Sequence, residues 1–234
     1  MSKAKVKPES AQIKSKDRVA AHGEVFTAER EVNAMLDLVK RETERIDSRF
    51  LEPACGTGNF LVKILERKLD VVKKKYRRSP LDFERNSILA LSSIYGVDIL
   101  SDNAEACRER LFNIWNRTYK STCKKDVNEE TQKTARFILE RNIVCGNALS
   151  LMKVDIEGND TANPIVFSEW AFIRGNIMQR KDYTFENLMR IGEKTVFEKE
   201  SASLFDNSDS SDEGKLLKQY TSDYRKLWQN DEQA

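Results

Sequence analysis

The amino-acid sequence predicts an α/β fold built around a parallel sheet. Short apolar segments with the character of strands alternate with helical patterns, and a glycine-containing turn follows the first strand and opens a helix. Strands that alternate with helices form βαβ units, which place parallel strands side by side with helices on the faces of the sheet. At 234 residues, the chain is long enough for one such domain with tails and too short for two substantial domains.

The first predicted element is an amphipathic helix, followed by a short strand. The apolar residues of the helix recur at i, i+3, i+4 and i+7, which is the spacing of one helix face: Val32, Met35, Leu36 and Val39. The strand covers residues 49–51 and runs directly into the glycine turn.

Two further helices follow the glycine turn. The apolar positions of the first have helical spacing: Leu61, Ile64, Leu65, Leu69 and Val72. The second begins at Ser79–Pro80 and covers residues 80–92. Serine is a favoured N-cap and proline fits the first turn of a helix, so this pair marks a helix start.

The remaining elements continue the alternation of strand and helix. A buried strand is predicted at 94–99, and a helix follows through Cys107, Leu111, Ile114 and Trp115. Another helical stretch covers 134–139. Two more strands are predicted at 142–145 and 165–167, the last of them the fourth strand of the parallel sheet.

Composition limits the classes of partner and site. Charged residues make up 33% of the chain but the net charge is only +2, which neither requires nor excludes binding to nucleic acid. No apolar run is long enough to cross a bilayer and no secretory segment opens the chain, so we expect a cytoplasmic protein without membrane contact. The four cysteines lack C-x-x-C spacing and the chain has one histidine, which predicts reduced thiols and no metal site.

The pattern divides the chain into a folded middle and two polar ends. Residues 1–17 are predicted to be a mobile basic arm, and residues 18–192 the folded domain. Residues 193–234 are predicted to be a polar, acidic tail with a short terminal helix. The large side chains of that helix have helical spacing and would dock it on the domain or on a partner: Tyr220, Tyr224, Leu227 and Trp228.

The glycine turn is the most specific motif in the chain. From Pro53 to Phe60 it reads P-A-C-G-T-G-N-F, and its glycines permit the close approach of backbone to a ligand. It resembles the S-adenosylmethionine-binding motif of N6-adenine DNA methyltransferases, the modification subunits of restriction–modification systems. The resemblance implies a Rossmann-like methyltransferase fold with S-adenosylmethionine as cofactor. The cofactor-binding residues that it implies in this segment are Glu52, Pro53, Ala54, Gly56, Gly58 and Phe60.

Two strand ends supply further candidate cofactor residues, since open α/β sheets bind ligands at the carboxyl ends of their strands. Asp98, followed by Ile99, can accept hydrogen bonds from both ribose hydroxyls of the cofactor. The alternative is a helix N-cap, and the resemblance favours the ribose role. Asn147, followed by Ala148, matches the G-[DN]-A-L segment of the family and would bond the adenine ring of the cofactor. A plain Asx turn is the alternative there.

The segment that precedes the first predicted helix, H-G-E-V-F-T-A-E, resembles the G-x-x-[FY]-T-P element of the same family. Thr27 is expected to cap the helix and to meet the methionine end of the cofactor. Phe26 would pack on the cofactor or act as a hydrophobic staple. Ala28 replaces the proline that is usual in the family.

The catalytic motif departs from the family pattern. Amino-methylating DNA enzymes carry [DNS]-P-P-[YFW] after the fourth strand, where the motif binds the exocyclic amine and stacks on the flipped base. Here the predicted strand runs into S-E-W-A-F, residues 168–172, so both prolines are missing. Ser168 fits the first position and Trp170 could stack on a base; these two are the candidate catalytic residues.

Two functions from different classes follow from the resemblance, and a third possibility stays beside them. The first is an S-adenosylmethionine-dependent adenine-N6 DNA methyltransferase of a restriction–modification or defence system. The second is a catalytically degenerate subunit that binds the cofactor, or only assembles, and needs a partner chain. A third is methylation of another substrate with Glu169 as general base.

The predicted sheet also bears on partners. The methyltransferase sheet normally has seven strands, and no clear strand follows Phe172, so the fold is predicted to be incomplete after the fourth strand. An unpaired sheet edge favours a protein partner or an oligomer. DNA would be bound through that partner, or weakly by the chain alone. The recognition sequence and the identity of the partner stay open.

Overall fold

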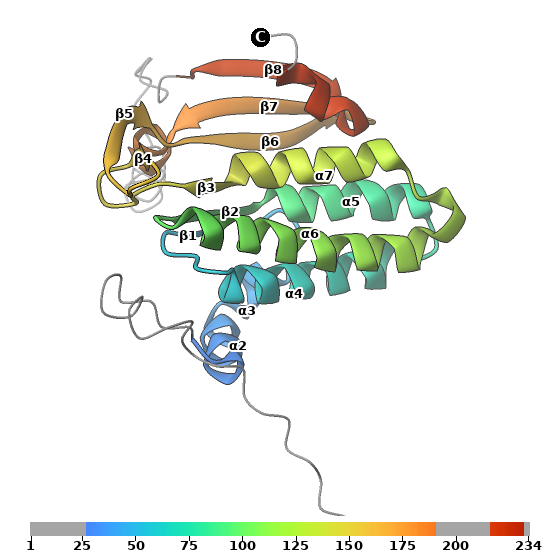
Figure 1. Cartoon of the computed structure of the whole chain (residues 1–234). Coiled ribbons are helices and arrows are strands. Elements are labelled where there is room, and N and C mark those ends of the chain that lie inside the picture. Colours follow the sequence, from blue (N-terminus) through green and yellow to red (C-terminus); the bar gives the residue numbers. More distant parts are fainter. Residues whose placement is uncertain (1–26, 191–215, 232–234) are drawn as a thin grey trace, which may run out of the picture.

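The structure is a computed structural model that describes residues 27–190 and 216–231 (Figure 1). The basic arm predicted at residues 1–17 lies outside the described residues, as does the acidic part of the predicted tail. The described parts combine a three-stranded parallel sheet, a layer of long helices and a three-stranded antiparallel sheet.

The parallel sheet confirms three of the predicted strands. It consists of β1 (Phe50–Glu52), β2 (Ile94–Asp98) and β3 (Ile143–Cys145), in the order β1-β2-β3. Both pairings are parallel. The carboxyl ends of the three strands therefore meet at one edge, where the loops that follow them can build a common site.

Four long helices connect and follow these strands, close to the predicted places. They are α4 (Asn59–Tyr76), α5 (Pro80–Ser92), α6 (Ser101–Cys123) and α7 (Glu129–Asn142). A 3₁₀ turn, η1 (Lys124–Asp126), joins α6 to α7. Ser79 is the N-cap of α5 as predicted, since its side chain accepts a hydrogen bond from the Asp82 backbone N–H at 3.4 Å. None of the described helices is long and apolar enough to span a membrane.

The first described helix, α2 (Glu29–Leu38), confirms the predicted element only in part and is followed by the short α3 (Lys40–Thr43). Val32 and Leu36 are buried, but Met35 and Val39 are about half exposed. The expected cap at Thr27 is wrong: Ala28 occupies the N-cap position and no side chain caps the helix. The helix begins at Glu29, so Thr27 lies one residue before the N-cap position.

The two faces of the parallel sheet are covered by different partners. Ile94 on β2 belongs to the main core, which is formed largely by the helices. Tyr95 and Val97, on the opposite face of the same strand, belong to a second cluster with Phe167 and Phe185. Residues 185–190 are helical and supply Phe185 and Leu188 to this second cluster, so Phe167 and a helical segment together cover the second face. Every residue of β2 is buried because aromatic side chains from a distant segment cover its second face.

The predicted fourth strand does not join the parallel sheet. It is the start of β6 (Val166–Arg174), which pairs antiparallel with β7 (Ile177–Thr184). The chain reverses at Gly175, whose φ of +54° suits glycine, so the strand continues as a hairpin. A smaller hairpin, β4 (Met152–Val154) with β5 (Asp160–Pro164), precedes it.

The end of the described chain belongs to the fold and not to a separate tail. Residues predicted as one helix split into β8 (Lys218–Asp223), which pairs antiparallel with β7, and the 3₁₀ helix η2 (Tyr224–Asp231). The hydroxyl of Tyr224 donates to buried Glu84 on α5, and Arg225 Nε donates to the same carboxylate at 2.7 Å. η2 packs along α7, which confirms the alternative in which this segment docks on the domain.

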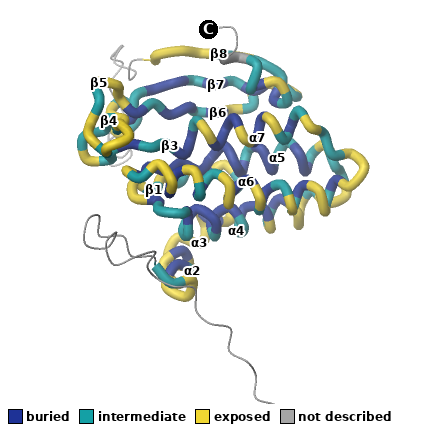
Figure 2. Tube along the Cα trace, in the orientation of Figure 1, coloured by how far each residue is buried: buried dark blue, intermediate teal, exposed yellow. Residues whose placement is uncertain are grey.

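Burial follows this layering. Figure 2 shows the buried backbone where β2, the long helices and β6–β7 meet, with β5 and β8 more exposed at the outside. Trp170 in β6 and Met178 in β7 lie in the main core, whereas Ile173 and Ile177 at the turn between these strands are exposed. One face of the antiparallel sheet therefore packs on the main core.

Candidate functional site

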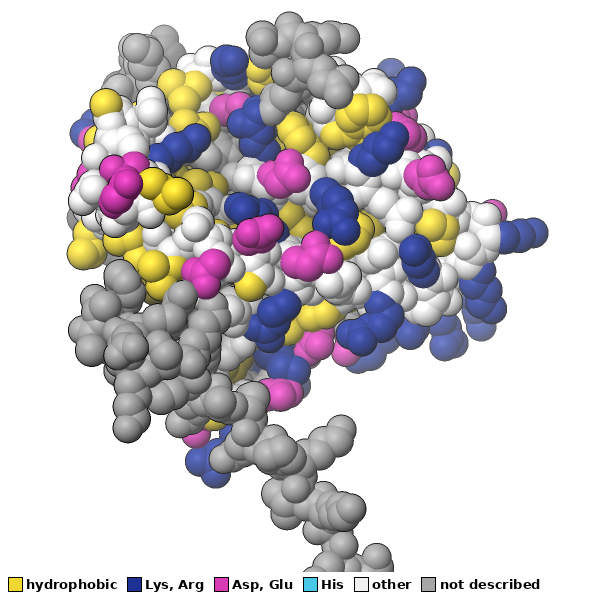
Figure 3. Space-filling view, viewed as in Figure 1, with side chains coloured by type: hydrophobic (Ala, Val, Ile, Leu, Met, Phe, Trp, Pro, Cys, Tyr) yellow, Lys and Arg dark blue, Asp and Glu magenta, His cyan; other side chains and the backbone are white. Residues whose placement is uncertain are grey.

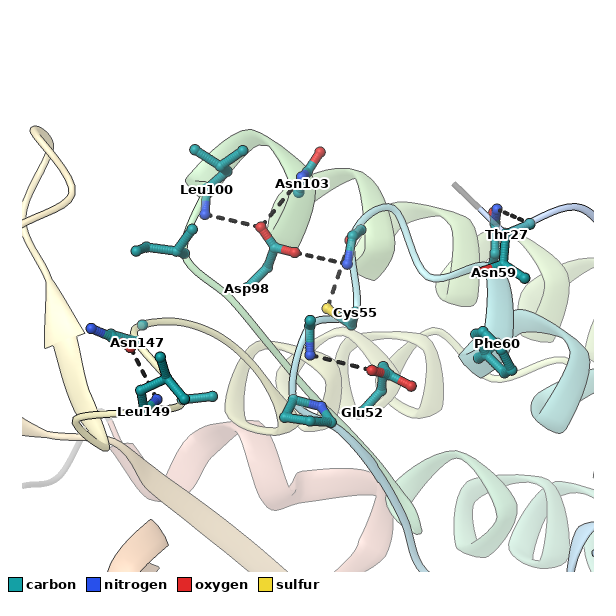
Figure 4. Close-up of a pocket in the computed structure, with 16 residues that line it drawn as sticks. Thr27, Glu52, Cys55, Asn59, Phe60, Asp98, Leu100, Asn103, Asn147 and Leu149 are labelled. Atoms are coloured by element: carbon teal, nitrogen blue, oxygen red, sulfur yellow. Dashed lines mark hydrogen bonds between the residues drawn. The ribbon is translucent and has the colours of Figure 1, made fainter. Parts of the chain in front are cut away.

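A cavity of about 540 Å³ opens at the carboxyl ends of β1, β2 and β3 (Figure 4). Its walls come from the loop between β1 and α4, the loop between β2 and α6, and the turn after β3. The lining residues that the sequence predicted are Thr27, Glu52, Pro53, Ala54, Gly56, Phe60, Asp98, Ile99, Asn147 and Ala148. Phe26 lies outside the described residues.

The glycine loop is shaped by two residues with positive φ. Gly56 has φ +51°, and Gly58 has φ +87° as the N-cap of α4. A Cβ on Gly58 would lie 2.6 Å from the Sγ of buried Cys107 on α6. Gly58 does not line the cavity, so packing against α6 and backbone conformation explain this glycine.

Asp98 links the loops after β1 and β2. Its Oδ2 accepts from the Gly56 N–H at 2.7 Å. Its Oδ1 accepts from the Leu100 N–H at 2.9 Å and from Asn103 Nδ2 at 3.3 Å. The N-cap of α6 is Leu100, so the alternative role of Asp98 as a helix cap is wrong. The side chain holds the glycine loop against the start of α6 while facing the cavity (Figure 4).

Asn147 adopts the Asx turn that is the alternative to a role in cofactor binding. Its Oδ1 accepts from the Leu149 N–H at 3.0 Å, and its Nδ2 donates to Asp160 Oδ1 at 3.1 Å. Both ends of the carboxamide are therefore engaged within the chain. The turn directs Ala148 and Leu149 to the rim of the cavity, where Leu149 is almost fully exposed.

The charged side chains that line the cavity are both acidic. Glu52 accepts from the Ala54 N–H at 3.3 Å, and burial raises the pKa of its carboxyl group. Asp98 is the second carboxylate, and no lysine, arginine or histidine is among the described lining residues. Such a cavity favours a ligand that carries positive charge and hydroxyl groups over an anionic one.

Residues that the sequence did not single out complete the wall: Cys55, Asn59, Leu100, Asn103, Gly146 and Leu149. Asn59 Nδ2 donates to the Thr27 carbonyl at 3.2 Å, which fastens the segment before α2 to the start of α4. Arg110 on α6 donates to Asn59 Oδ1 at 2.9 Å and to the Thr57 carbonyl at 2.6 Å. Asn59 could have been predicted as a wall residue, because it directly follows the glycine turn. The contact of Arg110 with this loop could not, because the two are about fifty residues apart in the sequence.

The structure does not bring the candidate catalytic residues to this cavity. Ser168 and Trp170 lie within β6, are 1% and 5% exposed, and do not line the cavity. Ser168 Oγ donates to Asp182 Oδ1 at 2.6 Å, and Trp170 Nε1 donates to Asn142 Oδ1 at 3.0 Å. The loop expected at residues 168–172 is a strand because its alternate side chains pack into the core.

Glu169, the other candidate of this segment, points the opposite way. It forms an ion pair with Arg49 just before β1 and is not part of the cavity wall. The segment S-E-W-A-F therefore packs β6 against its neighbours and contributes no residue to the cavity wall.

Comparison with known protein families identifies the chain. The model of the family described as "MmeI, DNA-methyltransferase domain" matches residues 26–201, which include the whole cavity wall. The chain belongs to this family. The recognition of a restriction–modification methyltransferase at the glycine loop is thereby confirmed.

One curated relative supports the same family. A protein of Methanocaldococcus jannaschii, provisionally named a type II restriction enzyme and methyltransferase, is 30% identical over 107 residues. The match covers 43% of this chain but only 8% of that protein, so the chain spans a small part of the relative's length. No solved structure matches the methyltransferase domain.

Proposed function

We propose that this methyltransferase domain is the S-adenosylmethionine-binding part of an adenine-N6 DNA methyltransferase of a restriction–modification or defence system. The negative charge of the side chains that line the cavity is the observation on which the proposal rests. S-adenosylmethionine bears a sulfonium and an ammonium group, and the only charged side chains of the described wall are Glu52 and Asp98. A dinucleotide or a nucleotide phosphate would find no basic partner there.

The fold around the cavity supports the same cofactor. A glycine loop after β1, a carboxylate at the end of β2 and a polar turn after β3 line one edge of a parallel sheet, the arrangement of a Rossmann-like methyltransferase. The cavity volume lies within the range of ligand sites. Asp98 Oδ2, which accepts one hydrogen bond within the chain, would accept another from a ribose hydroxyl, and Phe60 and Ile99 would supply apolar contact.

The bound cofactor would supply an electrophilic methyl group. The adenine amine can attack that methyl directly, so the protein needs no nucleophilic side chain and contributes by positioning the reactants. Within the described residues, the side chains that would hold the flipped adenine, Ser168 and Trp170, are buried in β6. We therefore favour a cofactor-binding part that needs further polypeptide, in a partner chain or elsewhere, for methyl transfer.

Titration calorimetry tests cofactor binding directly. The full chain is expected to bind S-adenosylmethionine. Asp98→Asn should weaken binding about tenfold or more, since a hydrogen bond to a charged group contributes roughly 1.5–3 kcal/mol. Asp70→Asn is the matched control, since Asp70 is exposed on α4, lies outside the cavity wall and should leave affinity unchanged. If the folded wild-type chain shows no binding at millimolar S-adenosylmethionine, the proposed cofactor site is wrong.

Methyl transfer is tested separately with labelled cofactor and duplex DNA that contains adenine. The isolated chain is expected to transfer little or no label. Robust methylation of adenine N6 by the chain alone would overturn the need for further polypeptide.

We also propose a cytoplasmic location. All four cysteines are free and three of them are buried, as expected for a protein of a reducing compartment.

A further inference from the structure

Two segments far from the cavity concentrate positive charge. Residues 73–78 read K-K-K-Y-R-R and residues 117–125 read R-T-Y-K-S-T-C-K-K. Together they hold nine basic residues and no acidic one, and all nine basic residues are exposed. Because the net charge of the whole chain is only +2, the rest of the sequence is net acidic. The positive charge is therefore gathered and not evenly spread.

The two segments lie side by side at one end of the molecule. Cys123 Sγ, at the end of α6, lies 3.6 Å from the Pro80 carbonyl oxygen at the start of α5. Lys73 and Arg117 line the same groove between α4 and α6, about 240 Å³ in volume. The connections α4–α5 and α6–α7 emerge together in Figure 1, opposite the strand ends. Dark blue side chains gather at this end in the lower right of Figure 3.

Local structure does not account for all of this charge. Lysines near the ends of α4 and α6 complement the helix dipoles, but Arg77, Arg78 and Lys125 lie beyond the last helical turns. None of the nine basic residues forms an ion pair with another described residue, whereas Lys63 and Lys133 elsewhere on the surface do. The acidic residues near this end are fewer than the nine basic ones: Glu66, Asp70, Asp82, Asp126, Glu129 and Glu130.

We propose that this surface, the basic end (residues 73–78 and 117–125), binds the phosphate backbone of duplex DNA outside the cofactor cavity. Exposed lysine and arginine side chains bind phosphates without reading sequence, which suits a contact that holds or orients DNA. The 18 residues of α4 separate the glycine loop from the basic end by about 27 Å, so the contact is distinct from the site of methyl transfer. The choice of DNA as ligand rests on the proposed function.

Fluorescence anisotropy with a labelled duplex of arbitrary sequence, at increasing KCl concentration, tests this contact with the full chain. The test variant removes five charges of the basic end: Lys74→Gln, Arg77→Gln, Arg78→Gln, Lys124→Gln and Lys125→Gln. The control variant removes five exposed charges elsewhere: Arg30→Gln, Arg41→Gln, Arg174→Gln, Lys218→Gln and Lys226→Gln.

The expected result is a change in salt dependence. Removing one side chain that neutralises a phosphate lowers the slope of log K against log salt by about 0.9 for duplex DNA. The test variant should lower the slope by roughly 3 to 4 and weaken binding more than tenfold at low salt, and the control by less than about 1. Equal losses of affinity in the two variants, or no loss in either, would overturn the proposal. Thermal melting establishes that both variants are folded.

A second measurement uses the unaltered chain. Acetylation of lysines, read by mass spectrometry, should be slowed by DNA at Lys74, Lys124 and Lys125 but not at Lys218 and Lys226. Equal rates with and without DNA at the basic end would also overturn the proposal.

Cofactor calorimetry separates this inference from the proposed function. The test variant, which lacks five charges of the basic end, should bind S-adenosylmethionine with the affinity of the wild type. Absence of the salt-slope effect with intact cofactor binding would reject the basic end alone. No cofactor binding by the wild-type chain, with the salt-slope effect present, would reject the proposed function alone.

Discussion

The cofactor cavity and the antiparallel sheet are built in opposite ways. The cavity takes its wall from short loops directly after β1, β2 and β3, so each loop carries its own local motif. The sheet of β6, β7 and β8 joins segments separated by more than thirty residues between β7 and β8, and its important side chains are buried. The residues of the cavity wall can therefore be predicted from local sequence motifs, whereas the antiparallel sheet depends on contacts between distant segments.

This difference explains why one motif was interpreted correctly and the other was not. The glycine loop needs its residue types for backbone conformation and a close approach to α6, which leaves a sequence pattern. The segment S-E-W-A-F resembles a loop motif only in letters. Its alternation suits a strand, with Ser168 and Trp170 inward and Glu169 outward in an ion pair with Arg49.

The largest expected effect is at Trp170 and concerns stability. Trp170→Ala should lower the free energy of unfolding by about 3–5 kcal/mol, because it leaves a cavity beside Phe137 and an unpaired Asn142 Oδ1. Trp170→Phe fills more of the space and should cost less, with unchanged affinity for S-adenosylmethionine. Urea unfolding and calorimetry measure the two effects. A Trp170→Phe protein of wild-type stability that loses methyl transfer in an active complex would restore the amine-binding role.

A matched pair of glycines tests the shape of the cofactor loop. Gly58 and Gly158 both have φ near +85°, but a Cβ would meet Cys107 Sγ only at Gly58 and nothing within 4 Å at Gly158. Alanine at either position costs about 1–2 kcal/mol of strain. Gly58→Ala adds about 1–3 kcal/mol of overpacking and should weaken cofactor binding. Equal destabilisation of the two variants in urea would show that contact with α6 does not shape the loop.

Lys68 tests the layer beneath the parallel sheet through pH. Its Nζ is buried and donates to the carbonyls of Ile46 and Ser48 and to Ser93 Oγ, and burial lowers its pKa from 10.5 to about 7. The unfolded chain then binds more protons than the folded chain between these two values. The cost of charging Lys68 is fully present below about pH 7 and is relieved as pH rises toward 10.5.

The measurement compares wild type with Lys68→Met, since methionine keeps a long side chain and does not titrate. Between pH 7 and 9 the stability of the wild type should rise relative to the variant by about 1 kcal/mol per pH unit in urea unfolding. Parallel pH profiles of the two proteins would mean that Lys68 keeps its ordinary pKa.

The smallest expected effect is at Arg110, which reaches the glycine loop from α6. Arg110→Ala removes its hydrogen bonds to Thr57 and Asn59 and should weaken cofactor binding roughly three- to tenfold without a change in melting temperature. Arg117→Ala is the control, because Arg117 is exposed two turns further along the same helix face. Equal cofactor affinity in both variants would show that Arg110 does not position the loop.

The sequence by itself determined the elements whose residues interact locally. The Ser79–Pro80 helix start, the three parallel strands and the glycine loop each leave a recognisable local pattern of residue types, and the structure confirms them, although the strands and the loop pack against distant segments. The same locality brought ten predicted residues to the cavity wall, since each loop follows directly from its own strand.

Tertiary structure alone decided the rest. Whether Thr27 caps α2, whether 165–167 joins the parallel sheet and whether 220–228 is a helix all depended on partners far along the chain. Phe167 and Phe185 cover β2, and Glu84 holds Tyr224 and Arg225, across separations that no local pattern records. An apolar residue shows that it will be buried, but its sequence position does not show against which segment it packs.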